Sequence, residues 1–467
     1  MNLVDYFAIS PLLILFATAL LLILLETFFK SKLLSWTMYA GLFLALYAAY
    51  ISPTSTSPLL TPWLKFDPIA RFFSLFFISI GVGSSLLASP FFKQFQQSRA
   101  EFYFFLLASL FGLILISSSN DFLTLFLGLE TLSIALYVLC GYVKKWTISH
   151  EAAFKYFLLG SISTSLLLFG IAMVYGATGT TRFDLLPATS SPLFLSGIAL
   201  ISLSLLFKAA VVPFHIWAPD VYAGAPSPVT AFMAVGTKAG AFAALIRIFL
   251  VTFTSFNPMW HQIIAYLAFP TLIYANFVAM RQTQLRRFFA YSGISHAGFL
   301  LIALASSAPN ATSAMLFYLV VYTIATLGAF AVLSFIDDTS EGVTLDSLKG
   351  LFYASPLKAA ILTLCLLTLG GIPPSVGFFA KFYVLQVGFQ AGYYGLVIVG
   401  LLTTIFAAYY YLRIVAVMIS EKQEIVKAEI RSYSALTASL FACIALIALS
   451  FYPEPLFSLM TSISMRS

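Results

Sequence analysis

The sequence predicts an all-α polytopic membrane protein with about fourteen transmembrane helices. Of its 467 residues, 61% are hydrophobic and only 9% are charged, whereas about 25% of the residues of a soluble domain are charged. Apolar runs of about 20 residues, the length that one spanning helix needs, recur from end to end of the chain. The mean hydropathy of +0.99 agrees with this fold class.

The apolar runs place the spans in order. The first run has no basic segment before it and no small-residue cleavage site, so we expect an uncleaved helix rather than a signal peptide. The run 355–388 is long for one span, so we expect a broken helix or two short pieces. The predicted spans are 8–29, 33–52, 68–90, 101–119, 121–142, 152–176, 192–216, 226–253, 259–280, 288–306, 311–336, 355–388, 392–419 and 432–458.

Several classes of function are disfavoured. The net charge of +7 is scattered through short loops, so it does not indicate nucleic-acid binding. Cys140, Cys365 and Cys443 stand singly in apolar runs, so no metal site, iron–sulfur site or disulfide is predicted. The chain has no Walker loop and no GxGxxG motif, so we expect it to draw energy from an ion gradient or a partner.

The loop charges predict the orientation. Odd-numbered loops hold thirteen Lys and Arg, including Arg281, Arg286 and Arg287 in one loop, against four on the other side. Positive loops stay in the cytoplasm. We therefore expect both termini on the outer side.

Titratable residues inside the spans are the strongest functional signal. Lys208 and Lys238 lie in apolar sequence on either side of a segment rich in turn residues, and Lys381 lies in a later span. A buried ammonium costs several kcal/mol unless it is paired, hydrated or neutralised. Each lysine therefore needs a partner or a wet cavity.

Prolines are expected to break two of these spans. Pro213 follows Lys208, whereas Pro373 and Pro374 precede Lys381. Such breaks are tolerated in membranes only where the backbone faces protein or water. A plain packing kink is the alternative for the first break.

Glu130 also lies at the middle of a span, where a carboxyl group is either protonated or paired. We hypothesise that Glu130 and Lys208 form a proton switch: the lysine stays charged while the carboxylate is close, and loses its proton when the carboxylate is distant. The alternative is a structural hydrogen bond between helices.

The remaining interior groups are more ambiguous. His296 is a candidate bridge between the two lysine regions, and His215 a candidate relay just past the first break; for both, a structural hydrogen bond stays open. Arg247 and Arg413 are expected to form structural pairs.

The broken spans suggest an internal repeat. We expect an N-terminal three-helix segment (1–100), a first five-helix repeat (101–253), a second (259–419), and a C-terminal loop with the last helix (420–467). Paired broken helices in corresponding positions indicate an ion site near the membrane midplane.

Four stretches together resemble subunit N of respiratory complex I and its counterpart in the cyanobacterial and chloroplast form of the enzyme. They are SHEAAFKYFLLGSISTSLLLFG (149–170), PFHIWAPDVYAGAPSPVTAF (213–232), RRFFAYSGISHAGFL (286–300) and LTLGGIPPSVGFFAKFYVL (367–385). The resemblance implies fourteen helices with two inverted five-helix repeats, and a proton-translocating subunit of an NADH:quinone or ferredoxin:quinone oxidoreductase, with the electron donor left open. It also implies that Glu130, Lys208, Lys238 and Lys381 are functional positions, with His296 at a family position.

The resemblance implies no cofactor in this chain, since flavin, iron–sulfur clusters and quinone belong to partner subunits. The expected partners are other complex I membrane subunits, both antiporter-like and small, within a bacterial plasma membrane or, alternatively, a thylakoid membrane. Two rival functions stay open: a subunit of a multi-subunit cation/proton antiporter, and a structural spacer that is sensitive to bulk at Gly236 or Gly240.

Overall fold

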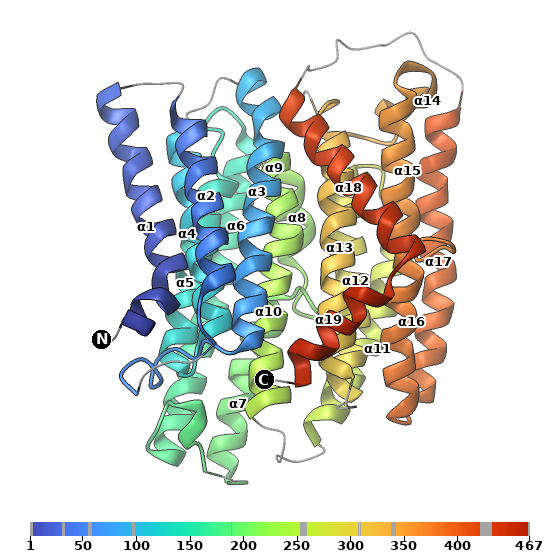
Figure 1. Ribbon diagram of the computed structural model, residues 1–467. Coiled ribbons are helices and arrows are strands. Elements are labelled where there is room, and N and C mark those ends of the chain that lie inside the picture. Colours follow the sequence, from blue (N-terminus) through green and yellow to red (C-terminus); the bar gives the residue numbers. More distant parts are fainter. Residues whose placement is uncertain are drawn as a thin grey trace.

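The computed structural model describes residues 3–29, 33–54, 58–95, 99–187, 189–252, 259–306, 308, 310–337, 342–420 and 432–465. In this part the named elements are all helices, and most run side by side in one bundle (Figure 1). The all-α prediction is confirmed.

The helices of the described part match the predicted count of spans. Twelve are long and apolar enough to cross a membrane, and two further spans are each built from two shorter helices. The twelve are α1 (Leu3–Phe29), α2 (Leu33–Ile51), α3 (Pro68–Phe95), α4 (Ala100–Ser118), α5 (Phe122–Cys140), α6 (Thr147–Thr178), the span Ser227–Thr252, α11 (Met259–Ala279), α12 (Leu285–Ser306), α13 (Ala311–Leu333), α17 (Tyr394–Ile419) and α18 (Tyr433–Phe451).

Both predicted breaks are present. The first span consists of α7 (Pro192–Lys208) and α8 (Trp217–Gly224), and the second of α15 (Pro356–Gly370) and α16 (Val376–Gln390). The residue before a proline is disfavoured in the helical conformation, and proline lacks the amide that continues a helix. Pro213, Pro373 and Pro374 lie in the gaps between the pieces.

The two breaks begin with the same C-terminal cap. Ala210 (φ 58°) follows α7 and Gly371 (φ 73°) follows α15, both in the left-handed region. In each cap the left-handed amide donates three positions back and the next amide donates five positions back, which is the Schellman pattern. The bonds are Ala210 to Phe207 and Val211 to Leu206, and Gly371 to Thr368 and Ile372 to Leu367.

The span Ser227–Thr252 is helical throughout but not uniformly α-helical. It consists of α9 (Ser227–Phe232), the π-helical segment η2 (Met233–Thr237), α10 (Lys238–Leu245) and a second π-helical segment, η3 (Ile246–Thr252). π-helical turns are rare and often occur at functional sites. Here η2 ends directly before Lys238.

The last predicted span, 432–458, is wrong in its extent. α18 ends at Phe451, and a separate helix, α19 (Glu454–Met465), follows. Pro453 explains the stop, because the preceding Tyr452 leaves the helical conformation, with φ −140° and ψ 74°. α18 and α19 together cross α13 obliquely (Figure 1).

Helix packing supports two repeats, although the limits 101–253 and 259–419 remain a prediction. In each half the first span packs on the second, the third on the fourth, and the fifth on both the first and the fourth. Figure 1 shows the two halves side by side, with α8 to α10 of the first half on the side that faces the second. Because five is an odd number, successive repeats enter the membrane from opposite sides.

Charged side chains join α8 of the first half to its neighbours. Arg286, predicted to lie in a loop, is instead buried near the start of α12, where its Nη2 donates to the Asp337 carboxylate at 2.8 and 2.9 Å. Its Nη1 donates to the Ala223 carbonyl on α8 at 3.2 Å. The neighbouring Arg287 and Lys155 of α6 both pair with Asp220 of α8 at 2.8 Å. The Arg286–Ala223 and Arg287–Asp220 contacts join α8 to α12, and the Lys155–Asp220 pair joins α8 to α6.

Candidate functional site

Lys208 is the last residue of α7, and the break leaves it inside the bundle with only 3% of its surface exposed. Its Nζ donates to the Ser133 hydroxyl of α5 at 2.7 Å. The ammonium also lies 5.4 Å from the centre of the Tyr156 ring and 5.7 Å from that of Tyr137. The rings stabilise a cation through their π faces, and the hydroxyl supplies an acceptor.

Glu130 lies on α5, three residues before Ser133, so the two side chains are neighbours on one helix face. Its Oε1 accepts a hydrogen bond from the Thr164 hydroxyl of α6 at 2.6 Å. Within the described residues no ion pair joins Glu130 to Lys208. Glu130 and Lys208, the predicted switch residues, therefore lie in one cluster, but each forms a hydrogen bond with a different hydroxyl group.

Lys238 begins α10 and is 2% exposed. Its Nζ lies 5.5 Å from the centre of the Tyr322 ring, which belongs to α13 in the second half. The Tyr322 hydroxyl donates to the Ala234 carbonyl in η2 at 3.1 Å. The π-helical turn before Lys238 is thus in direct contact with the second half.

His296 lies in α12 with both ring nitrogens engaged by tyrosines. Nδ1 is 2.6 Å from the Tyr318 hydroxyl, and Nε2 is 3.4 Å from the Tyr411 hydroxyl of α17. The Tyr322 ring centre is 4.7 Å from the imidazole centre. His296 is therefore held from two sides, an arrangement that suits both a fixed packing residue and an oriented proton carrier.

Lys381 lies on α16 and is 5% exposed. Its Nζ donates to the Gly370 carbonyl at 2.7 Å and lies 5.0 Å from the centre of the Phe299 ring. Gly370 is the last residue of α15, and the last carbonyls of a helix have no partner within it and carry partial negative charge. The second break therefore supplies the acceptor for its own lysine.

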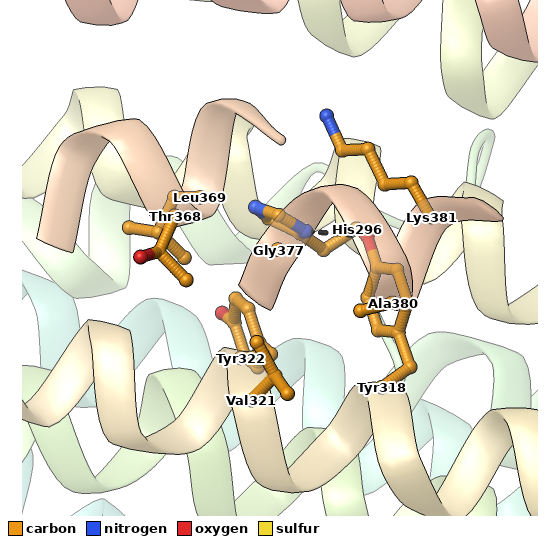
Figure 2. A pocket seen from close by; sticks show the side chains of 9 residues that line it. All are labelled: His296, Tyr318, Val321, Tyr322, Thr368, Leu369, Gly377, Ala380 and Lys381. Carbon is orange, nitrogen blue, oxygen red and sulfur yellow. Dashed lines mark hydrogen bonds between the residues drawn. The ribbon is translucent and has the colours of Figure 1, made fainter. Parts of the chain in front are cut away.

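A small cavity separates His296 from Lys381. Its volume of about 10 Å³ is close to the minimum that admits one water molecule. Figure 2 shows the side chains that line it, with the His296–Tyr318 hydrogen bond drawn as a dashed line. The lining residues are His296, Tyr318, Val321, Tyr322, Thr368, Leu369, Gly377, Ala380 and Lys381.

The predicted site residues form two clusters rather than one continuous row. Glu130, Ser133 and Lys208 make the first-half cluster; Lys238, Tyr322, His296 and Lys381 make the central cluster. Within the described residues no hydrogen bond or ion pair joins the two clusters. The central cluster extends from Lys238 to Lys381.

His215 and the two deep arginines lie apart from these clusters. His215 lies edge-on to Tyr274 with ring centres 4.8 Å apart, and nothing joins it to Lys208 in the described part. Arg247 forms a buried two-point pair with Asp67 at 2.9 and 3.0 Å, which agrees with structural pairing. The Arg413 Nη1 donates to the Met280 carbonyl at 2.8 Å.

Sequence reasoning missed the tyrosines of the central cluster. Tyr318, Tyr322 and Tyr411 are almost fully buried around His296. The chain has 24 tyrosines, and tyrosine is common in membrane proteins at the lipid headgroup level. No local pattern distinguishes these three, because their role follows from tertiary packing.

Comparison with known proteins identifies the family. Residues 119–407 match the model of the family described as "NADH:quinone oxidoreductase/Mrp antiporter, TM". The chain is 54% identical over 476 residues to NADH-quinone oxidoreductase subunit N of Protochlamydia amoebophila (strain UWE25), a match that covers 99% of each protein.

Two solved structures have the same fold. A chain of respiratory complex I from Thermus thermophilus with bound Aureothin superposes with a TM-score of 0.83 at 32% identity, covering 96% of this chain and 98% of that chain. A chain of the Mrp complex from Dietzia sp. DQ12-45-1b gives a TM-score of 0.84 at 20% identity, covering 99% and 97%, which shows the fold alone. The family model and the full-length relative indicate the same family. The chain therefore belongs to the subunit N family of NADH-quinone oxidoreductase, whose members are membrane subunits of respiratory complex I.

Proposed function

We propose that this chain carries protons across the membrane, along Glu130, Lys208, Lys238, His296 and Lys381, and that redox chemistry in partner subunits drives them. One observation carries the proposal: the central cluster places two buried lysines on either side of a histidine, with a water-sized cavity before the second lysine. Buried charges at this depth are costly and are retained where they serve transport.

The first-half cluster supplies the switch. Glu130 and Lys208 are near enough on α5 and α7 to attract each other, yet each is bound to a hydroxyl. A shift of α5 or α7 that brings the carboxylate to the ammonium stabilises the charged lysine, and the reverse shift favours release of its proton. Lys208 ends a helix at a break, so it can move without displacing the whole span.

The central cluster completes the path. A proton that leaves Lys208 passes to Lys238, then through His296 to Lys381. The gap between the two clusters has to be bridged by movement or by water, since no side-chain contact spans it in the described part. The Gly370 carbonyl holds Lys381 at the end of this path.

The setting of the chain follows from the family and the loop charges. We propose that flavin, iron–sulfur clusters and quinone are held by partner subunits, which include antiporter-like and small membrane subunits. We further propose a bacterial plasma membrane, with the lysine-rich loops in the cytoplasm and both termini on the outer side.

The test measures proton uptake and NADH oxidation together, in membrane vesicles that contain the assembled complex. Glu130→Gln and Lys208→Met are expected to slow proton uptake by tenfold or more, on the order of one lost charge interaction at a buried site. Glu101→Gln and Lys349→Met, two exposed positions outside both clusters, are the matched controls and are expected to behave like the parent.

Other outcomes discriminate the rivals. If both pairs of variants pump equally well, the proton-path proposal is wrong. A spacer role predicts instead that only bulk matters: Gly240→Leu, whose side chain would meet Leu113, would release the chain from the complex while Lys208→Met would not change transport. Sodium-dependent proton exchange without an electron donor would favour the antiporter.

A further inference from the structure

Tyr322 lies where the two halves of the molecule meet. It belongs to α13 of the second half, yet its ring centre is 5.5 Å from Lys238 Nζ of the first half. The ring centre also lies 4.7 Å from that of His296. Tyr322 therefore contacts two titratable groups of the central cluster, and it is 4% exposed.

The hydroxyl of Tyr322 fastens the ring to the helix that carries Lys238. Its acceptor is the Ala234 carbonyl, at 3.1 Å. Ala234 precedes Lys238 by four residues, which places it about one turn away on the same side of the helix. It also lies within the π-helical segment η2, so the hydrogen bond anchors the irregular turn as well as the ring.

A glycine on a third helix makes room for this contact. A Cβ built on Gly293 of α12 would lie 2.7 Å from Lys238 Nζ and 3.1 Å from the Tyr322 hydroxyl. The Lys238 ammonium and the Tyr322 hydroxyl therefore both lie close to the Gly293 Cα, in the space that a side chain would occupy. Gly293 is three residues before His296, so this space lies beside the histidine on the same helix face.

We propose that Tyr322 is a positioning residue that holds the Lys238 ammonium beside His296 and so joins the first half of the proton path to the second. The proposal rests on the proposed function. The aromatic face stabilises the cation, and the hydroxyl bond keeps that face against η2 when the helices shift. Without this hold, Lys238 would be free to turn away from His296.

A simpler alternative is that Tyr322 only fills space between α13 and η2. Space-filling needs the ring but not the hydroxyl. Tyr322→Phe keeps the ring and loses the hydroxyl, whereas Tyr322→Leu loses both. The two variants therefore separate packing from positioning.

The experiment uses membrane vesicles that contain the assembled complex and records proton uptake, NADH oxidation and the pH profile of both. Tyr322→Phe is expected to slow proton uptake about fivefold, the effect of one lost hydrogen bond on the placement of Lys238, and Tyr322→Leu to slow it further. The alkaline limb of the uptake profile should move to lower pH, because a ring without its hydroxyl bond to Ala234 is no longer held against the charged lysine. A purely structural loss would not move that limb.

Tyr410→Phe is the matched control. Its hydroxyl also makes one buried hydrogen bond, to the Asn276 amide oxygen at 3.0 Å, but that bond lies outside the central cluster. Tyr410→Phe is expected to keep the parental uptake rate and pH profile. Equal behaviour of Tyr322→Phe and Tyr410→Phe would overturn the inference, and Tyr322→Phe decides the matter if Tyr322→Leu does not assemble.

A third variant, Lys238→Met, tests the proposed proton path independently of the role of Tyr322. If Lys238→Met stops proton uptake while both Tyr322 variants match the control, the positioning role fails and the proton path stands. If Lys238→Met itself leaves proton uptake unchanged, the proposed path fails, and the inference fails with it.

Discussion

The two broken spans share a cap but treat their lysines differently. Ala210 and Gly371 occupy the same left-handed position, and a proline stands three residues after each. Lys208, however, lies before its break and bonds a side-chain hydroxyl on another helix. Lys381 lies after its break and bonds a backbone carbonyl of its own broken span.

The difference is in whether the partner of the lysine can be exchanged. A side-chain partner on a separate helix can be exchanged for another, and under the proposed function Glu130 is that other partner. A carbonyl at a helix end is fixed and cannot change its charge. The first break is thus suited to switching, and the second to holding a lysine in one place.

The second pieces of the two spans also differ in what holds them. α8 is held by Arg286, which pairs with Asp337 and donates to the Ala223 carbonyl, and by ion pairs to Asp220. α16 packs on α12 and α13, and its buried residues are mostly apolar, among them Val376, Val384 and Leu385. Three substitutions probe this contrast.

The largest effect is expected at Arg286. Arg286→Met leaves the buried Asp337 carboxylate without its partner, and breaking such a pair costs about 3–5 kcal/mol. Heat-induced unfolding of the subunit in the purified complex should begin at a markedly lower temperature. Arg287→Met removes a half-exposed pair and should cost well under about 1 kcal/mol. Equal losses for the two neighbours would show that α8 does not depend on the buried pair.

An intermediate effect is expected at Gly371. Gly371→Ala imposes a left-handed conformation on a side chain and drives its Cβ to 2.6 Å from Lys381 Cδ. The two costs together are about 2–4 kcal/mol, measured as a lower unfolding temperature and slower proton uptake.

Gly392→Ala calibrates this result. Gly392 also has a positive φ, of 83°, but nothing lies within 4 Å of its added Cβ, so it reports the backbone cost alone. If Gly371→Ala is no worse than Gly392→Ala, the contact with Lys381 is unimportant.

The smallest effect is expected at Ala210, with the opposite sign. Ala210→Gly relieves a left-handed alanine, and after the added flexibility of the unfolded chain is subtracted, about 0.5–1 kcal/mol of stability remains. The unfolding temperature should rise slightly. Ala209→Gly, at a right-handed position, should lower it by a similar amount. A fall for both variants would mean that the two caps are not equivalent.

The sequence predicts the fold well because its signals are local. Apolar runs place the spans, and prolines place both breaks. The last span is predicted too long because the apolar run continues past Pro453, which ends the helix. Arg286 is predicted in a loop because its partner, Asp337, is distant in sequence.

The candidate site is predicted in part, for a similar reason. A lone charge in an apolar run is visible in the sequence, so Glu130, Lys208, Lys238 and Lys381 stand out. Which groups they contact depends on how helices pack. The separate partners of Glu130 and Lys208, and the contact of the Tyr322 ring with Lys238, could not be predicted from residue spacing.

The spans that carry Lys238 and His296 have almost no surface exposed to lipid, since nearly all of their residues are buried by other helices. The membrane tolerates such a charged span poorly while it stands alone. During synthesis the insertion of these spans therefore depends on helices that are made before and after them. Those helices, rather than lipid, surround the charged side chains in the folded protein. A shortened chain that keeps Lys238 but lacks those neighbouring helices would therefore fail to insert this span into the membrane.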